Sequence, residues 1–180
     1  MPSGRTHLRI ELFLFPVALF GFWYWVFPLL ELRYQWQAFS LFGGAYLLSS
    51  LLLSPDLDLR HNSARNNWGV LGFVWIPYTK IFKHRGLSHN LIFGMLTRLA
   101  YLSLIGAMIV LAVWAVIQYV LRRELAIPQW QVNAYGYNWY WLAIFLGGLW
   151  LPNMIHILID RIHSAFRRKK HKVRKTCVNL

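Results

Sequence analysis

Residues 91–121 read LIFGMLTRLAYLSLIGAMIVLAVWAVIQYVL, an apolar run in which Arg98 is the only charged side chain. Roughly 20 residues of α-helix cross the hydrocarbon core of a bilayer, so this run is longer than one crossing requires. We expect it to form a membrane helix that tilts or projects into water. The run indicates that the chain resides in a membrane.

The composition of the whole chain supports the same fold class. Of its 180 residues, 57% are hydrophobic and 17% are aromatic, and the mean hydropathy is +0.39. A soluble domain of this size would have to expose the excess of apolar side chains to water. Lipid tails solvate such side chains directly, which removes that cost. The length suits one domain.

Three further runs have the composition of membrane helices, and they cover residues 10–30, 38–53 and 139–159. Each is long enough, or nearly long enough, to cross a bilayer. The second run holds Gly43 and Gly44, small residues that allow helices to pack closely. Together with residues 91–121, these runs predict four spans.

A shorter apolar run, residues 68–82, lies between the second and third spans and contains Pro77. Its length and its aromatic content indicate an interfacial or re-entrant segment. The sequence therefore predicts an all-α fold, a polytopic membrane helix bundle of about four transmembrane helices with this segment between helices two and three. We expect a single membrane domain over residues 1–166 and a basic cytoplasmic tail over residues 167–180.

The chain is strongly basic, with 19 Lys and Arg against 6 Asp and Glu and a net charge of +13. Such a charge could indicate nucleic-acid binding, but the basic residues lie between apolar runs and in the tail, and no nucleic-acid motif accompanies them. We therefore expect no nucleic-acid partner. The tail is instead expected to be attracted to anionic head groups, which makes membrane lipids the expected partners.

Lys and Arg are distributed unevenly between the two sides of the predicted spans. One side holds Arg33, Arg122 and Arg123, Arg98 lies within a span, and all the other Lys and Arg fall on the opposite side. Basic residues accumulate on the cytoplasmic side of membrane proteins. We therefore expect both termini in the cytoplasm, which four spans permit.

Acidic and histidine side chains gather at the cytoplasmic ends of the predicted spans. They are His7 before the first span, Asp56 and Asp58 after the second, His84 and His89 before the third, and His156 and Asp160 at the end of the fourth. His156 and Asp160 are one helical turn apart and share a face. Carboxylate oxygen and neutral imidazole nitrogen suit a divalent metal, with Zn²⁺ preferred and Mn²⁺ or Fe²⁺ as alternatives.

Each part of this pattern also has a simpler interpretation. Asp56 and Asp58 could cap a helix or pair with nearby arginines. A lone histidine at a span end is commonly an interfacial residue, and we keep that interpretation for His61, His163 and His171. Neither interpretation predicts that acids and histidines converge on one side, so the convergence favours a metal site.

The sequence is consistent with more than one role for each of two arginines. Arg85, between two candidate ligands, could hold a phosphate or carboxylate through two hydrogen bonds, or it could be one more cytoplasmic charge. Arg98, inside a span, could extend toward the interface or pair with Glu11 or a site carboxylate.

At these residues the chain resembles a bacterial family of uncharacterised membrane-associated metal-binding proteins. The matching features are Pro2-Ser3-Gly4-Arg5-Thr6-His7, Pro55-Asp56-Leu57-Asp58, Trp75-Ile76-Pro77-Tyr78, His84-Arg85, Ser88-His89, and His156 with Asp160. More distantly it resembles the predicted membrane-bound metal-dependent hydrolases, whose pattern includes Pro-Asp-x-Asp and a late His-x-x-x-Asp. Leu8 departs from the closer family, which often has an acid at that position.

The resemblance implies a bacterial inner membrane or an internal membrane as the location. It also implies a metal site whose residues are His7, Asp56, Asp58, His84, His89, His156 and Asp160. The function expected from these residues is a metal-dependent hydrolase acting on a phosphoester, or on a lipid-linked substrate, at the cytoplasmic face. Arg85 would hold the phosphate, and Asp58 or His89 would be the general base.

Two other functions compete with the hydrolase. A non-catalytic metal-binding protein would use the same residues in a structural or assembly role. A metal-independent lipid phosphatase would also carry a late His-x-x-x-Asp, but the Ser-Arg expected upstream of His156 is absent. The sequence leaves the oligomeric state open.

Overall fold

The computed structural model describes residues 4–59, 63–82, 90–120 and 139–178. Within these residues every regular element is a helix, and four helices are long and apolar enough to cross a membrane. The predicted all-α fold with about four membrane-length helices is therefore confirmed.

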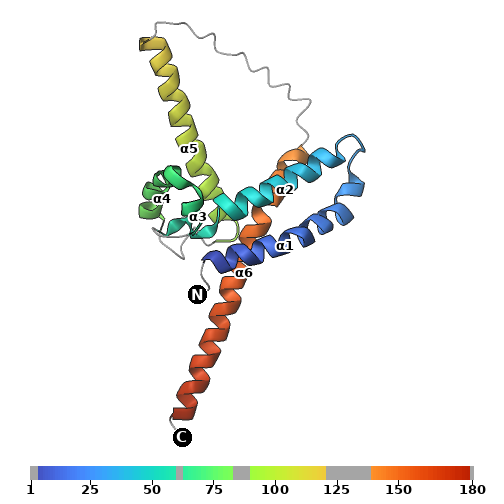
Figure 1. Cartoon of the computed structure of the whole chain (residues 1–180), viewed down its shortest axis with the longest axis vertical. Helices are drawn as coiled ribbons and strands as arrows, with labels where there is room; N and C mark the ends of the chain where they lie inside the picture. Colours follow the sequence, from blue (N-terminus) through green and yellow to red (C-terminus); the bar gives the residue numbers. More distant parts are fainter. Residues whose placement is uncertain (1–3, 60–62, 83–89, 121–138, 179–180) are drawn as a thin grey trace.

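The four long helices follow one another along the chain with short helical extensions (Figure 1). They are α1 (Gly4–Trp25) with η1 (Phe27–Leu29), α2 (Gln35–Leu52) with η2 (Pro55–Asp58), α5 (Phe93–Ala115) with the π-helical turn η5 (Val116–Val120), and α6 (Trp139–Val178). Helices α1, α2 and α6 pack together, whereas the far half of α5 leads away from them (Figure 1).

Helix α1 begins earlier than the sequence indicated. The sequence places His7 ahead of a first span starting at residue 10, but α1 begins at Gly4 and contains His7 in its first turn. Hydropathy locates only the apolar part of a helix, whereas the polar residues before it continue the same backbone hydrogen bonding. Pro16 lies inside α1 without ending it.

Helix α6 is longer than the predicted fourth span. It continues past residue 159 to Val178, so the basic tail continues the same helix (Figure 1). Residues Trp139–Phe166 of α6 are long and apolar enough to cross a membrane. The hydropathy falls along α6, but its residues still favour helix, because Arg and Lys are good helix formers.

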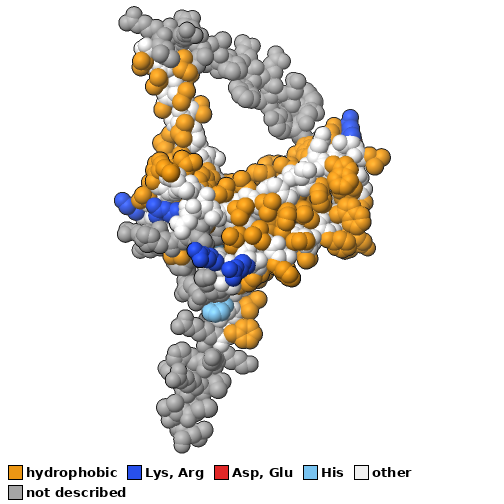
Figure 2. Space-filling view, viewed as in Figure 1, with side chains coloured by type: hydrophobic (Ala, Val, Ile, Leu, Met, Phe, Trp, Pro, Cys, Tyr) orange, Lys and Arg blue, Asp and Glu red, His pale blue; other side chains and the backbone are white. Residues whose placement is uncertain are grey.

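Buried polar groups and exposed apolar side chains occur together in the bundle, unlike in a typical soluble domain. Along α1, Phe13, Val17 and Phe20 are each more than 60% exposed, while Glu11 is 2% exposed. Hydrophobic side chains cover much of the visible face of the molecule (Figure 2). Exposing such a surface to water would cost free energy, whereas lipid tails solvate it directly.

Helices α2 and α6 cross in close contact at Gly148. A methyl group at this position would lie 2.6 Å from the Phe42 carbonyl oxygen and 2.8 Å from the Ala45 side chain. One turn of α2 further along, the Ser49 hydroxyl donates a 2.6 Å hydrogen bond to the Leu149 carbonyl. Only glycine allows this backbone approach.

Gly148→Ala is therefore expected to lower the free energy of unfolding by about 1–3 kcal/mol, because the added methyl group must push two backbones apart. Gly147→Ala is the matched control, since a methyl group there meets nothing within 4 Å and gains the same helix propensity. Denaturant unfolding in detergent measures both variants. Equal stability of the two would contradict the close crossing.

Between η2 and α5, the described residues form three short helices, α3 (Ser63–Asn67), η3 (Gly69–Val74) and α4 (Trp75–Ile81). Among the described residues of this segment no helix has the length of a span. Trp75 and Tyr78 are fully buried and contact Tyr101 of α5. The position of this unit relative to a bilayer stays a prediction.

The near end of α5 is held by Arg98, which is 1% exposed. Its guanidinium donates to the carbonyls of Gly94 and Leu53 and, over 2.6 Å, to Oδ1 of Asn153 on α6. Arg98 therefore does not extend toward the interface, which was one of its two expected roles. Its hydrogen bonds connect α5 to the end of α2 and to α6.

Candidate metal centre

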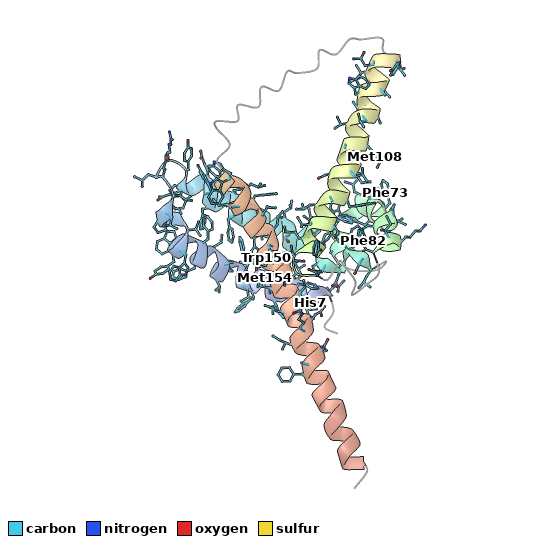
Figure 3. All side chains as sticks on the ribbon, turned by 180° about the vertical axis from the view of Figure 1, so that it is seen from behind. His7, Phe73, Phe82, Met108, Trp150 and Met154 are labelled. Atoms are coloured by element: carbon cyan, nitrogen blue, oxygen red, sulfur yellow. The ribbon has the colours of Figure 1, made fainter. Side chains whose placement is uncertain are left out.

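Three of the predicted metal residues lie together where α1 crosses the middle of α6. They are His7 from α1 and His156 and Asp160 from α6, and one ligand atom from each lies within 4.8 Å of the others. Figure 3 shows His7 beside α6. The residues are 2%, 1% and 8% exposed, so the centre lies inside the bundle.

Helix geometry places these side chains. His156 and Asp160 are separated by one turn and therefore point from the same face of α6. The imidazole of His7 stacks on that of His156, with ring centroids 4.1 Å apart and planes 23° apart. Its Nε2 lies 3.2 Å from Oδ1 of Asp160.

Asp56 reaches the same centre from η2. Its Oδ1 lies 3.5 Å from Nε2 of His156, and its side chain is 14% exposed. Pro55 begins η2 and fixes the backbone direction directly after α2, so the chain turns Asp56 toward α6. Three separate segments of the chain thus meet at one group of donors.

The residues present fit a divalent transition metal. Two ligand atoms of a tetrahedral zinc ion lie roughly 3.3 Å apart, given zinc–ligand distances of about 2.0–2.1 Å. The separations from His7 to Asp160 and from His156 to Asp56, 3.2 and 3.5 Å, lie on either side of that value. Hydrogen bonds between ions are shorter, about 2.7–2.9 Å. Nδ1 of His7 is also buried without a hydrogen-bond partner among the described residues.

Asp58 occupies a different environment from Asp56. It is 5% exposed, and its charge acts on Arg98 and on the phenol of Tyr78. Burial raises the pKa of Tyr78, which shares a 3.1 Å hydrogen bond with Thr97. Asp58 thus lies toward α4 and α5, and the group of three ligands does not include it.

The other predicted site residues cannot be placed. His84, Arg85 and His89 lie outside the described residues, as does His61. His163, which we interpreted as a bystander, has an exposed side chain. The side chain of His171 also lies outside the described part of the chain.

Sequence reasoning missed one acidic residue at the centre. Glu11 is 2% exposed, and its Oε1 lies 2.9 Å from Nδ1 of His156. The signal was its spacing of four residues from His7, one turn of helix. That signal is visible only if the helix includes His7, and our predicted first span began after it.

Comparison with known proteins agrees with a metal site. An uncharacterized protein of Aquifex aeolicus (strain VF5) is 43% identical over 61 residues, which are 34% of this chain and 43% of that protein. The aligned part therefore spans less than half of the relative. No solved structure matches the chain. A profile of the family described as uncharacterized metal-binding protein (DUF2227) matches residues 2–170, so this chain belongs to that family of metal-binding proteins.

Proposed function

We propose that this protein is a membrane-bound, metal-dependent hydrolase that cleaves a phosphoester at the cytoplasmic face of a bacterial membrane. The observation that carries the proposal is the buried group of His7, His156 and Asp160, with Asp56 beside it. Two imidazoles with carboxylates are a donor set used by hydrolytic zinc sites, and Mn²⁺ or Fe²⁺ would also suit it.

When bound, a divalent cation supplies Lewis-acid activation of water and of a phosphoryl group. The residues of the chain would bind the cation and determine from which side a substrate reaches it. The side chains of His7 and His156 are 3% and 1% exposed, whereas those of Asp160 and Asp56 are 11% and 14% exposed. The substrate would therefore approach from the side of the carboxylates. Arg85 remains the proposed phosphate ligand, with Asp58 or His89 as the proposed base.

A lipid-linked substrate suits the surroundings of the centre. The α3–α4 unit docks on the end of α2, where Asn67 and Trp68 donate to the carbonyls of Leu51 and Leu52. It also exposes apolar side chains, including Val70 at 90% and Phe73 at 59%. Such a unit beside η2 could guide acyl chains toward Asp56.

A non-catalytic metal site is the second candidate, and the burial of the centre favours it. Structural zinc sites are closed, whereas catalytic sites keep a position open to water. A cation held by α1, η2 and α6 would connect three segments, and metal binding would then contribute directly to folding.

Cleavage and melting temperature of the purified protein, each measured with and without a chelator, distinguish the two functions. The hydrolase predicts cleavage of bis(p-nitrophenyl) phosphate or phosphatidic acid that EDTA abolishes and Zn²⁺ or Mn²⁺ restores. Absence of cleavage with Zn²⁺, Mn²⁺ or Mg²⁺, in protein that retains metal, would contradict the hydrolase. A melting temperature unchanged by chelation would contradict the structural role.

A further inference from the structure

Glu11 is a buried acid whose partner is a candidate metal ligand. It is the single acidic residue of α1 and faces α6, where its Oε1 lies 2.9 Å from Nδ1 of His156. An ionised or polar group is costly at 2% exposure unless it makes good hydrogen bonds. The hydrogen bond with Nδ1 of His156 meets this requirement for Glu11. It occupies one side of the imidazole.

The opposite side of the same imidazole faces the metal centre. Nε2 of His156 lies 3.5 Å from Oδ1 of Asp56, and its ring stacks on His7. A histidine that binds a metal through Nε2 carries its proton on Nδ1, and a carboxylate accepts that proton's hydrogen bond. The two nitrogens of His156 therefore have separate partners that are consistent with one tautomer.

The backbone of Glu11 is fixed independently of its carboxylate. The hydroxyl of Tyr46 on α2 donates a 2.8 Å hydrogen bond to the carbonyl oxygen of Glu11. This bond ties α1 to α2 at the turn that carries Glu11. The direction of the carboxylate toward His156 is thus set by packing of three helices.

We propose that Glu11 is a positioning residue, which holds His156 in the Nδ1–H tautomer and directs Nε2 toward the metal. The proposal rests on the metal centre of the proposed function but not on hydrolysis. Hydrogen-bond partners of this kind typically change metal affinity by about 10–100-fold when they are removed. A merely structural Glu11 would join α1 to α6 without influencing metal affinity.

The test is the zinc affinity of purified Glu11→Gln, measured by competition with a chromophoric chelator. We expect the dissociation constant to rise about 10–100-fold, because the amide is nearly isosteric but accepts the hydrogen bond more weakly or donates to Nδ1 instead. Tyr46→Phe is the matched control, since it removes the hydrogen bond to the backbone carbonyl of Glu11 and leaves the carboxylate in place. Its dissociation constant should stay within about twofold of wild type.

A second measurement keeps the proposal testable if the variant does not fold. In zinc-loaded wild type, ¹⁵N NMR of labelled histidine should show His156 with the proton on Nδ1, and a proton on Nε2 would overturn the proposal. An unchanged zinc dissociation constant in folded Glu11→Gln would also overturn it. Wild type that binds no zinc would overturn the centre itself. Lower affinity in Glu11→Gln together with no phosphoester cleavage by wild type would support Glu11 and contradict only the hydrolase.

Discussion

His156→Ala is expected to remove the bound metal from the purified protein. The imidazole of His156 contacts Asp56, His7 and Glu11, so its loss removes one candidate ligand and disturbs three neighbouring side chains. Loss of a ligand should weaken metal binding beyond the roughly 10–100-fold caused by loss of a ligand's hydrogen-bond partner. Metal that survives purification of wild type would therefore be absent from the variant.

Elemental analysis of the purified proteins measures this loss directly. His163→Ala is the matched control, because His163 lies on the same helix with an exposed side chain and should retain the wild-type metal content. Asp56→Ala and Asp160→Asn should each lower the content as well. Full retention of metal in His156→Ala would show that the centre lies elsewhere in the chain.

Arg98→Leu is expected to cause the largest loss of stability of any substitution in the described bundle. It removes the donors to the Leu53 carbonyl and to Asn153, and both acceptors are buried. The negative charge of Asp58 also loses a nearby positive charge. Unsatisfied buried acceptors and an uncompensated charge together cost roughly 3–5 kcal/mol.

Reversible unfolding in detergent gives the free energy of unfolding of each variant. Arg161→Leu is the control, since Arg161 is exposed on α6 and its removal should change stability by less than about 0.5 kcal/mol. The free energy of unfolding of Arg98→Lys should lie between those of Arg98→Leu and Arg161→Leu. An ammonium group keeps the charge but cannot reproduce the several planar hydrogen bonds of a guanidinium. Similar stabilities for Arg98→Leu and Arg161→Leu would contradict the proposed connection of α5.

The sequence predicted the helices well where the signal is local. The spans at residues 38–53 and 91–121 match α2 and α5, with its extension η5, within a few residues. Hydropathy along the chain indicates which segments are apolar enough to be solvated by lipid. The pair of His156 and Asp160 was also visible, because a spacing of four residues fixes a shared helix face.

The same local signal located helix ends poorly. Polar residues can extend a helix beyond the apolar run, as they do at the start of α1 and at the end of α6. The error at α1 had a consequence for the site, because it separated His7 from Glu11 and concealed that the two residues lie one turn apart. A single misplaced boundary thus left Glu11 considered only as a partner of Arg98 and not as a neighbour of the metal site.

By itself, the sequence determined that this protein is all-helical, has four membrane-length helices and belongs with metal-binding proteins. The tertiary structure alone decided which donors meet. Asp56 and Asp58 are nearly equivalent in sequence, yet Asp56 lies beside His156, whereas the charge of Asp58 acts on Arg98 more strongly than that of Asp56 does. The physical reason is that hydropathy is a property of each segment, whereas the meeting of side chains depends on how helices rotate and cross. That crossing also brought Glu11 to His156, a contact that no spacing within one segment encodes.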